Sequence, residues 1–179
     1  VGELGIGIAD GHGKILSPQE PGRLDHVFGI TRQDSRIALR KDKTVPEPTA
    51  TGLEFPELSF NYLEFGVAAA AAEVLAKANE NKVPIAFVNS YGKGLAVYLA
   101  CDLTTGYFLA NGARGIGNNA KYSAATEAFI TDLCATAGAT PQLGIKNDSG
   151  EPVPFTRTVM FTQGEIKYFG ILREHRLAK

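Results

Sequence analysis

The stretch from Pro84 to Leu103 constrains the fold more strongly than any other part of the chain. It reads PIAFVNSYGKGLAVYLACDL, so two apolar, β-rich arms flank the short glycine loop SYGKG. Two such arms joined by such a loop predict an antiparallel β-hairpin. The second arm is apolar on both faces, with Leu95, Val97, Leu99 and Cys101 on one and Ala96, Tyr98 and Ala100 on the other. This pattern predicts a sheet that is covered on both sides.

Capping residues and apolar periodicity predict two helices. The first is short, covers 23–30 and ends at Gly29, because glycine accepts the left-handed conformation that closes many helices. The second begins at Asn118 or Asn119, whose side chains can cap a helix N-terminus, and stops at Gly138.

Alternating or β-rich runs predict further strands over 4–9, 35–40, 58–65, 143–147, 155–162 and 165–174. The alanine-rich segment 72–78 fits either a helix or a strand. Glycine- and proline-bearing segments predict loops over 10–22 and 41–52. A change of character near Pro141 predicts a boundary between two units, 1–140 and 141–179, the second of which is a β-strand extension.

Composition argues against several classes of partner. The 179 residues carry a formal net charge of −1, so we expect no binding to nucleic acid or to an anionic membrane. No apolar run approaches the ~20 residues of a transmembrane helix. The start of the chain lacks the pattern of a signal peptide, so we expect a soluble protein of unknown compartment. Because the first residue is Val1, we expect the chain to be a piece of a longer protein.

The lysine between two glycines is interpreted as part of a turn. A phosphate-binding loop is longer and leads directly into a helix, so that its N–H groups face the phosphate. The Gly92-Lys93-Gly94 segment instead leads into a strand. Lys93 is therefore expected to be a solvated charge at the tip of a hairpin.

The end of the second arm carries Cys101 and Asp102, where ligands often bind in open α/β sheets. A catalytic thiol needs a neighbouring base and a strained strand-to-helix turn, but ACDLTTG lacks the glycines of such a turn and the next histidine is His175. Asp10 also follows a predicted strand, as the carboxylates of glycoside hydrolases do, yet nothing in the sequence ties it to Asp102. We therefore expect no catalytic, cofactor-binding or metal-binding residue. Asp10, Cys101, Asp102 and Tyr107 remain candidates for facing a ligand.

Two other patterns resemble binding sites, but neither is interpreted as one. The glycine-rich segment 111–119 precedes a helix, but it follows no clear strand, so it is expected to be a loop rather than an anion site. A metal set can be imagined from four residues whose spacing matches no common ligand pattern, namely Asp10, His12, Asp25 and His26.

Three stretches carry a family resemblance. GIGIADGHGKILSPQEPGRLDHVFGI (5–30) is similar to a strand, an acidic turn and a small helix ending in Phe-Gly-Val. VPIAFVNSYGKGLAVYLACDL (83–103) resembles a strand with a proline, a Tyr-Gly-Lys-Gly turn and a return strand. GEPVPFTRTVMFTQGEIKYFGILRE (150–174) resembles the start of a β-rich region. Together they resemble the β-galactosidase trimerisation domain, of the class I glutamine-amidotransferase-like superfamily.

The resemblance implies an α/β fold, a partial three-layer flavodoxin-like sheet with a β-rich C-terminal extension, in which 1–140 is the α/β domain and 141–179 leads into a β-rich domain. It favours a strand over 72–78. It also implies that the domain follows a catalytic barrel, packs subunits together and borders the active site, so that no catalytic residue carries over. The family's opening strand–helix units are missing here, and a doubly wound sheet without them would expose an apolar edge. We therefore expect a homo-oligomer, or a second chain or segment that completes the sheet.

The leading hypothesis is a non-catalytic accessory and oligomerisation module of a glycoside-hydrolase-like protein, without a cofactor. One alternative is a stand-alone amidotransferase-like hydrolase that uses Cys101 or Asp10, although the Gly-x-Cys-x-Gly motif of amidotransferases is missing. Another is a carbohydrate-binding module that stacks sugars on Tyr91, Tyr107 and Phe108, although tryptophan, a favoured stacking residue, is absent.

Overall fold

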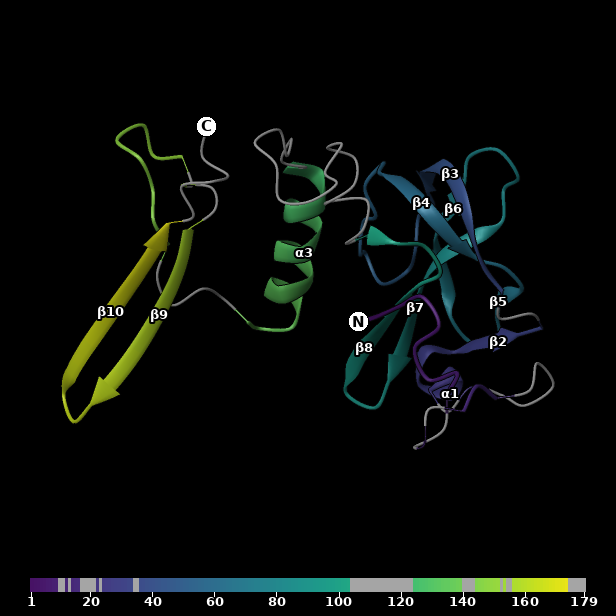
Figure 1. Cartoon of the computed structure of the whole chain (residues 1–179), viewed down its shortest axis with the longest axis horizontal. Helices are drawn as coiled ribbons and strands as arrows, with labels where there is room; N and C mark the ends of the chain where they lie inside the picture. The colour runs from purple at the N-terminus through teal and green to yellow at the C-terminus, as the bar shows by residue number, and fades with distance from the viewer. Residues whose placement is uncertain are drawn as a thin grey trace.

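Most of the described chain consists of β-strands. The computed structural model describes residues 1–9, 12, 14–16, 22, 24–33, 36–103, 124–139, 144–151, 153 and 156–173. In these residues the strands are β1 (Gly2–Glu3), β2 (Ile30–Arg32), β3 (Ile37–Pro46), β4 (Ser59–Glu64), β5 (Val67–Ala69), β6 (Glu73–Ala78), β7 (Pro84–Tyr91), β8 (Gly94–Leu99), β9 (Thr156–Gln163) and β10 (Ile166–Arg173). The two helices of the described part are α1 (Asp25–Phe28) and α3 (Ala124–Thr136) (Figure 1).

The predicted hairpin forms β7 and β8 and lies inside a six-stranded sheet of order β1-β8-β7-β6-β3-β4. Tyr91 pairs with Gly94, and Gly92 between them has a φ of 59°, which a residue with a side chain rarely adopts. The strand predictions over 58–65 and 72–78 are confirmed by β4 and β6. Helix α1 confirms the helix prediction, because Gly29 closes it in the left-handed conformation.

The sheet also curls back on itself. Leu63 of β4 forms an isolated antiparallel bridge with Cys101, just beyond β8. The Glu64 N–H donates to the Ala100 carbonyl at 2.8 Å, and the Asp102 N–H donates to the Tyr62 carbonyl at 3.3 Å. Strand β4 is therefore hydrogen bonded to β3 on one side and to the continuation of β8 on the other, which links the two ends of the sheet.

Two apolar clusters cover the two faces of the hairpin, as its pattern predicts. The larger one joins Val97, Leu99 and Cys101 to side chains of β4, β6 and β7 and to Phe129 of α3. Phe129 meets Phe55, from the loop before β4, at a ring-centroid distance of 4.7 Å. The smaller cluster joins Phe87, Ala96, Tyr98 and Ala100 to Phe28 of α1 and to β2 and β5.

The predicted three-layer flavodoxin-like sheet is wrong. Neighbouring strands pair antiparallel throughout the main sheet except for β1, which pairs parallel with β8. The links β6–β7 (79–83) and β7–β8 (92–93) are too short for the crossover helix that parallel neighbours require. The argument that half of a doubly wound sheet is missing, and that a partner must complete it, therefore loses its basis.

Several local predictions also need correction. The expected strand over 4–9 is wrong, because the strand in this region is β1 at Gly2–Glu3 and the chain turns at Leu4–Gly7. The expected loop 41–52 is extended up to Pro46, because β3 continues along β4 and then along β6. The expected strand 143–147 contains no named strand in its described residues; instead Asn147 accepts N–H groups from a tight turn that ends at Glu151.

The C-terminal strands β9 and β10 form a separate two-stranded antiparallel hairpin. In Figure 1 it lies apart from the main sheet, with α3 between them. This confirms the strands expected over 155–162 and 165–174, whereas the division into 1–140 and 141–179 stays a prediction. No helix of the described residues is both long and apolar enough to cross a membrane.

Candidate functional site

Cys101, one of the four candidates from the sequence, is completely buried in the larger apolar cluster. Burial, and secondarily the negative charges of Asp102 and Glu3, raise the pKa of the Cys101 thiol far above its ordinary value. The thiolate is the nucleophilic form of cysteine, and here its formation is strongly disfavoured. This environment suits a small apolar core residue better than a reacting thiol.

Asp102 is also completely buried and holds the curled sheet together. Its Oδ1 accepts the N–H groups of Asn61 at 2.8 Å and Tyr62 at 2.6 Å. Its Oδ2 has no hydrogen-bond partner and is shielded from solvent. Asp102 therefore fastens β4 to the end of β8. The other two candidates, Asp10 and Tyr107, lie outside the described residues, as do Phe108 and the segment 111–119.

The strongest concentration of buried charge in the described chain is a cluster that the sequence did not predict. The Arg32 guanidinium forms ion pairs with Asp25 and with Glu64, the latter from Nε to Oε1 at 2.9 Å. All three side chains are almost fully buried. The Tyr98 hydroxyl donates to Glu64 Oε2, and the Arg32 guanidinium lies 5.0 Å from the centre of the Tyr98 ring. We call these four residues the Arg32 cluster.

The Arg32 cluster also binds the backbone of the N-terminal turn. The Gly5 N–H donates to Glu64 Oε2 at 2.7 Å and to the Tyr98 hydroxyl at 3.1 Å. Arg32 donates to the Ile6 carbonyl at 3.1 Å. Burial and the neighbouring Glu64 carboxylate raise the pKa of the Tyr98 phenol above its usual value, so Tyr98 remains a hydrogen-bond donor. Because its carboxylates are engaged inside the protein, the cluster suits positioning of the N-terminal turn rather than catalysis.

Sequence reasoning missed this cluster because its members come from α1, β2, β4 and β8, far apart along the chain. The available signal was Glu64 at the end of an aromatic, apolar strand, since a carboxylate in such a place needs a buried partner. Asp25 is committed to Arg32 and also accepts the Gly22 N–H at 2.7 Å. No group of three or more potential metal ligands occurs among the described residues.

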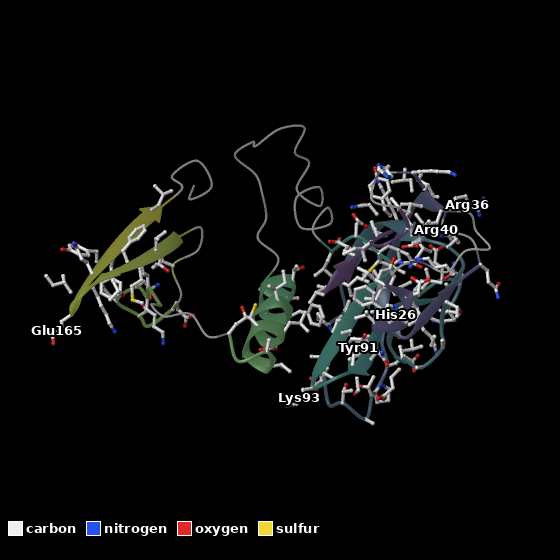
Figure 2. All side chains as sticks on the ribbon, turned by 90° about the horizontal axis from the view of Figure 1, so that it is seen from below. His26, Arg36, Arg40, Tyr91, Lys93 and Glu165 are labelled. Atoms are coloured by element: carbon white, nitrogen blue, oxygen red, sulfur yellow. The ribbon has the colours of Figure 1, made fainter. Side chains whose placement is uncertain are left out.

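The surface near the tip of β7–β8 carries Tyr91, which is the one residue proposed for sugar stacking that lies within the described part of the chain. Tyr91 is 48% exposed, and its ring meets the ring of His26 from α1 at a centroid distance of 5.9 Å, with the rings 71° apart. Figure 2 labels both, with Lys93 at the end of the hairpin. This is an open, polar-edged aromatic surface, in contrast to the buried Cys101 and Asp102.

Comparison with known structures finds fold similarity to parts of two β-galactosidases. The enzyme from Bacillus circulans sp. alkalophilus matches with a TM-score of 0.65 and 17% identity, over 96% of this chain and 22% of that one. The enzyme from Rahnella sp. R3 matches with a TM-score of 0.66 and 19% identity, over the same shares. No protein-family model and no curated protein sequence matches the chain. The chain thus spans about a fifth of the length of these two enzymes and is similar in fold to that part of them.

Proposed function

We propose that this chain is a non-catalytic accessory module of a glycoside-hydrolase-like protein of the β-galactosidase type, and that it packs subunits together. The fold similarity to about a fifth of two β-galactosidases supports the first part. The buried, engaged carboxylates of the Arg32 cluster and the unreactive environment of Cys101 support a role without catalysis. The alternative of a hydrolase that uses Cys101 loses its main support, because a buried protonated thiol cannot attack a substrate.

The observation that carries the packing role is the exposed apolar surface of the β9–β10 hairpin. Its large apolar side chains are 49% to 64% exposed, namely Val159, Phe161, Ile166, Tyr168, Phe169, Ile171 and Leu172. An isolated two-stranded hairpin is at best marginally stable in water, and an exposed apolar patch usually marks a contact with another surface. The hairpin is therefore a surface that a partner stabilises.

The strand register supports one face of the hairpin as the one that binds a partner. Tyr168 pairs with Phe161 and Gly170 pairs with Val159, so these residues share one face with Ile166 and Leu172. The opposite face carries Lys167, Thr158 and Thr162 beside the apolar residues Met160, Phe169 and Ile171. The first face carries five large apolar residues against three on the opposite face, with Gln163 and Arg157 as its polar residues. Gly170 leaves a gap on this face that a protruding side chain of a second copy can fill. We propose a second copy of the chain as the partner, in a homo-oligomer.

Two measurements on the 179-residue chain test the proposal. Sedimentation velocity over a range of concentrations is expected to show self-association that Phe161→Lys abolishes, because a lysine there would have to be buried without a partner. Leu39→Lys is the matched control, since Leu39 is equally exposed but lies on β3 of the main sheet. The wild-type chain is expected not to hydrolyse an aryl β-galactoside.

The proposed packing role is wrong if the wild-type chain remains a monomer at all concentrations, or if both lysine variants weaken association equally. Hydrolysis of the galactoside by the purified chain would overturn the non-catalytic assignment. Far-UV circular dichroism of each variant separates a lost interface from a lost fold.

A further inference from the structure

We propose that the tip of the β7–β8 hairpin is a binding site for a pyranose sugar, in which the Tyr91 ring is the stacking surface and His26 the polar edge. Three features support this site: the pairing of β7 with β8, the two glycines of the turn, and the attachment of α1 to β7. The site is separate from the β9–β10 hairpin that carries the packing proposal.

Strand alternation places Tyr91 on the α1-facing side of β7. Phe87 and Asn89 share that side, and both are buried, Phe87 in the smaller apolar cluster and Asn89 against α1. Tyr91 is the next residue on this side of the strand. It lies beyond the side chains that bury Phe87 and Asn89, so its own side chain is 48% exposed. Its backbone is nevertheless fixed, because Tyr91 pairs with Gly94 at the end of the ladder.

The surroundings of the ring contain little side-chain bulk. The residue across the strand is Gly94 and the residue after Tyr91 is Gly92. A Cβ atom built on either glycine would meet nothing within 4 Å, so both positions open to free space. In most hairpins a cross-strand side chain would cover part of such a ring. Here a flat ligand can approach the ring from the side of the turn.

The partner ring of His26 is held at a defined angle. Helix α1 is fixed to β7 because the Asn89 side-chain amide donates to the Val27 carbonyl at 2.8 Å. Gly29, which closes α1, lies so close to Asn89 that an added Cβ would come within 2.7 Å of its side chain. The exposed rings of His26 and Tyr91, at 71° to each other, therefore form a corner between two anchored elements.

This corner matches the chemistry of a sugar. A pyranose has an apolar C–H face that stacks on an aromatic ring, and hydroxyl groups around its rim that need hydrogen-bond partners. The imidazole nitrogens of His26 donate or accept, and Lys93, exposed at the tip of the β7–β8 hairpin, has an ammonium group with three donors. A site with one aromatic ring and so few atoms in contact is expected to bind a monosaccharide in the millimolar range. The choice of galactosides as the first ligands rests on the proposed function, whereas the stacking site does not.

The test is a titration of the 179-residue chain with methyl β-galactopyranoside and, separately, methyl β-glucopyranoside, followed by NMR of the tyrosine ring signals and by saturation transfer to the sugar. We expect saturable shifts that Tyr91→Ala abolishes and that His26→Ala weakens about fivefold, as for the loss of one hydrogen bond. Leu39→Ala is the control, because Leu39 is 65% exposed but lies on β3, outside both proposed surfaces. It is expected to leave binding unchanged.

The outcomes separate the two proposals. Absence of saturable binding of either sugar well above millimolar concentration, or binding that survives Tyr91→Ala, would overturn the sugar site. Equal binding of both sugars supports the site and counts against the galactoside choice that rests on the proposed function. Self-association lost in Phe161→Lys while binding persists would show that the two surfaces act independently, as the structure implies.

Discussion

Replacing Arg32 by methionine should destabilise the fold far more than removing an exposed ion pair. Arg32 and its two carboxylate partners are almost fully buried, so the substitution leaves the Asp25 and Glu64 charges inside the protein without their counter-ion. It also removes the bond from Arg32 to the Ile6 carbonyl. Breaking a buried ion pair by removing one partner typically costs about 3–5 kcal/mol, and we expect a loss of unfolding free energy in that range.

A second variant separates charge burial from packing. In the triple variant Arg32→Met, Asp25→Asn and Glu64→Gln no unpaired charge remains, and the amides keep oxygen atoms that can accept the Gly5 and Gly22 N–H groups. We therefore expect the triple variant to recover a large part of the stability lost in Arg32→Met, because replacement of a whole buried charge cluster is often close to neutral.

Urea unfolding followed by circular dichroism at 25 °C measures both effects. The control is Arg40→Met, which removes the ion pair between Arg40 and Glu80. The Arg40 side chain is 41% exposed and the Glu80 side chain is 57% exposed. Exposed pairs contribute about 0–1 kcal/mol, so the control should stay close to the wild type. Equal losses of unfolding free energy in Arg32→Met and Arg40→Met, or no recovery in the triple variant, would refute the view that buried ion pairs of the Arg32 cluster stabilise the fold.

Four further predictions concern the core. A thiol reagent should label the exposed Cys134 readily and Cys101 only on unfolding. Because burial raises the pKa of the Cys101 thiol, stability should fall as pH rises above the ordinary pKa of cysteine, and Cys101→Ser should reduce that slope in urea titrations at several pH values. Asp102→Ala should cost about 2 kcal/mol or more in urea unfolding and Asp102→Asn less, since asparagine keeps an acceptor for the two N–H groups of β4. Phe129→Ala should cost about 3 kcal/mol in the same assay, while Ile130→Ala, 45% exposed on the same helix, should change stability by less than ~0.5 kcal/mol; similar losses would contradict the docking of α3 through Phe129.

The local elements were accessible from the sequence because their signals lie within a few residues. Gly29 closes α1 by its left-handed backbone, and Gly92 with Gly94 permits the turn between β7 and β8. The two-sided apolar pattern of β8 correctly indicated cover on both faces. The family resemblance pointed to β-galactosidases, with which the structure shares a fold over part of their length, but it also suggested the wrong architecture.

What the sequence alone determined is therefore the β7–β8 hairpin, the strands β4, β6, β9 and β10, the short helix and the cover on both faces of β8, since turn chemistry and apolar alternation act over short distances. The tertiary structure alone decided that the sheet curls until Leu63 meets Cys101, and that Arg32 meets Asp25, Glu64 and Tyr98. These contacts join elements tens of residues apart, and only the mutual packing of strands selects such partners. No local periodicity predicts these contacts. A buried charged residue can be interpreted only once its counter-ion is known, and that partner lies far away in the sequence.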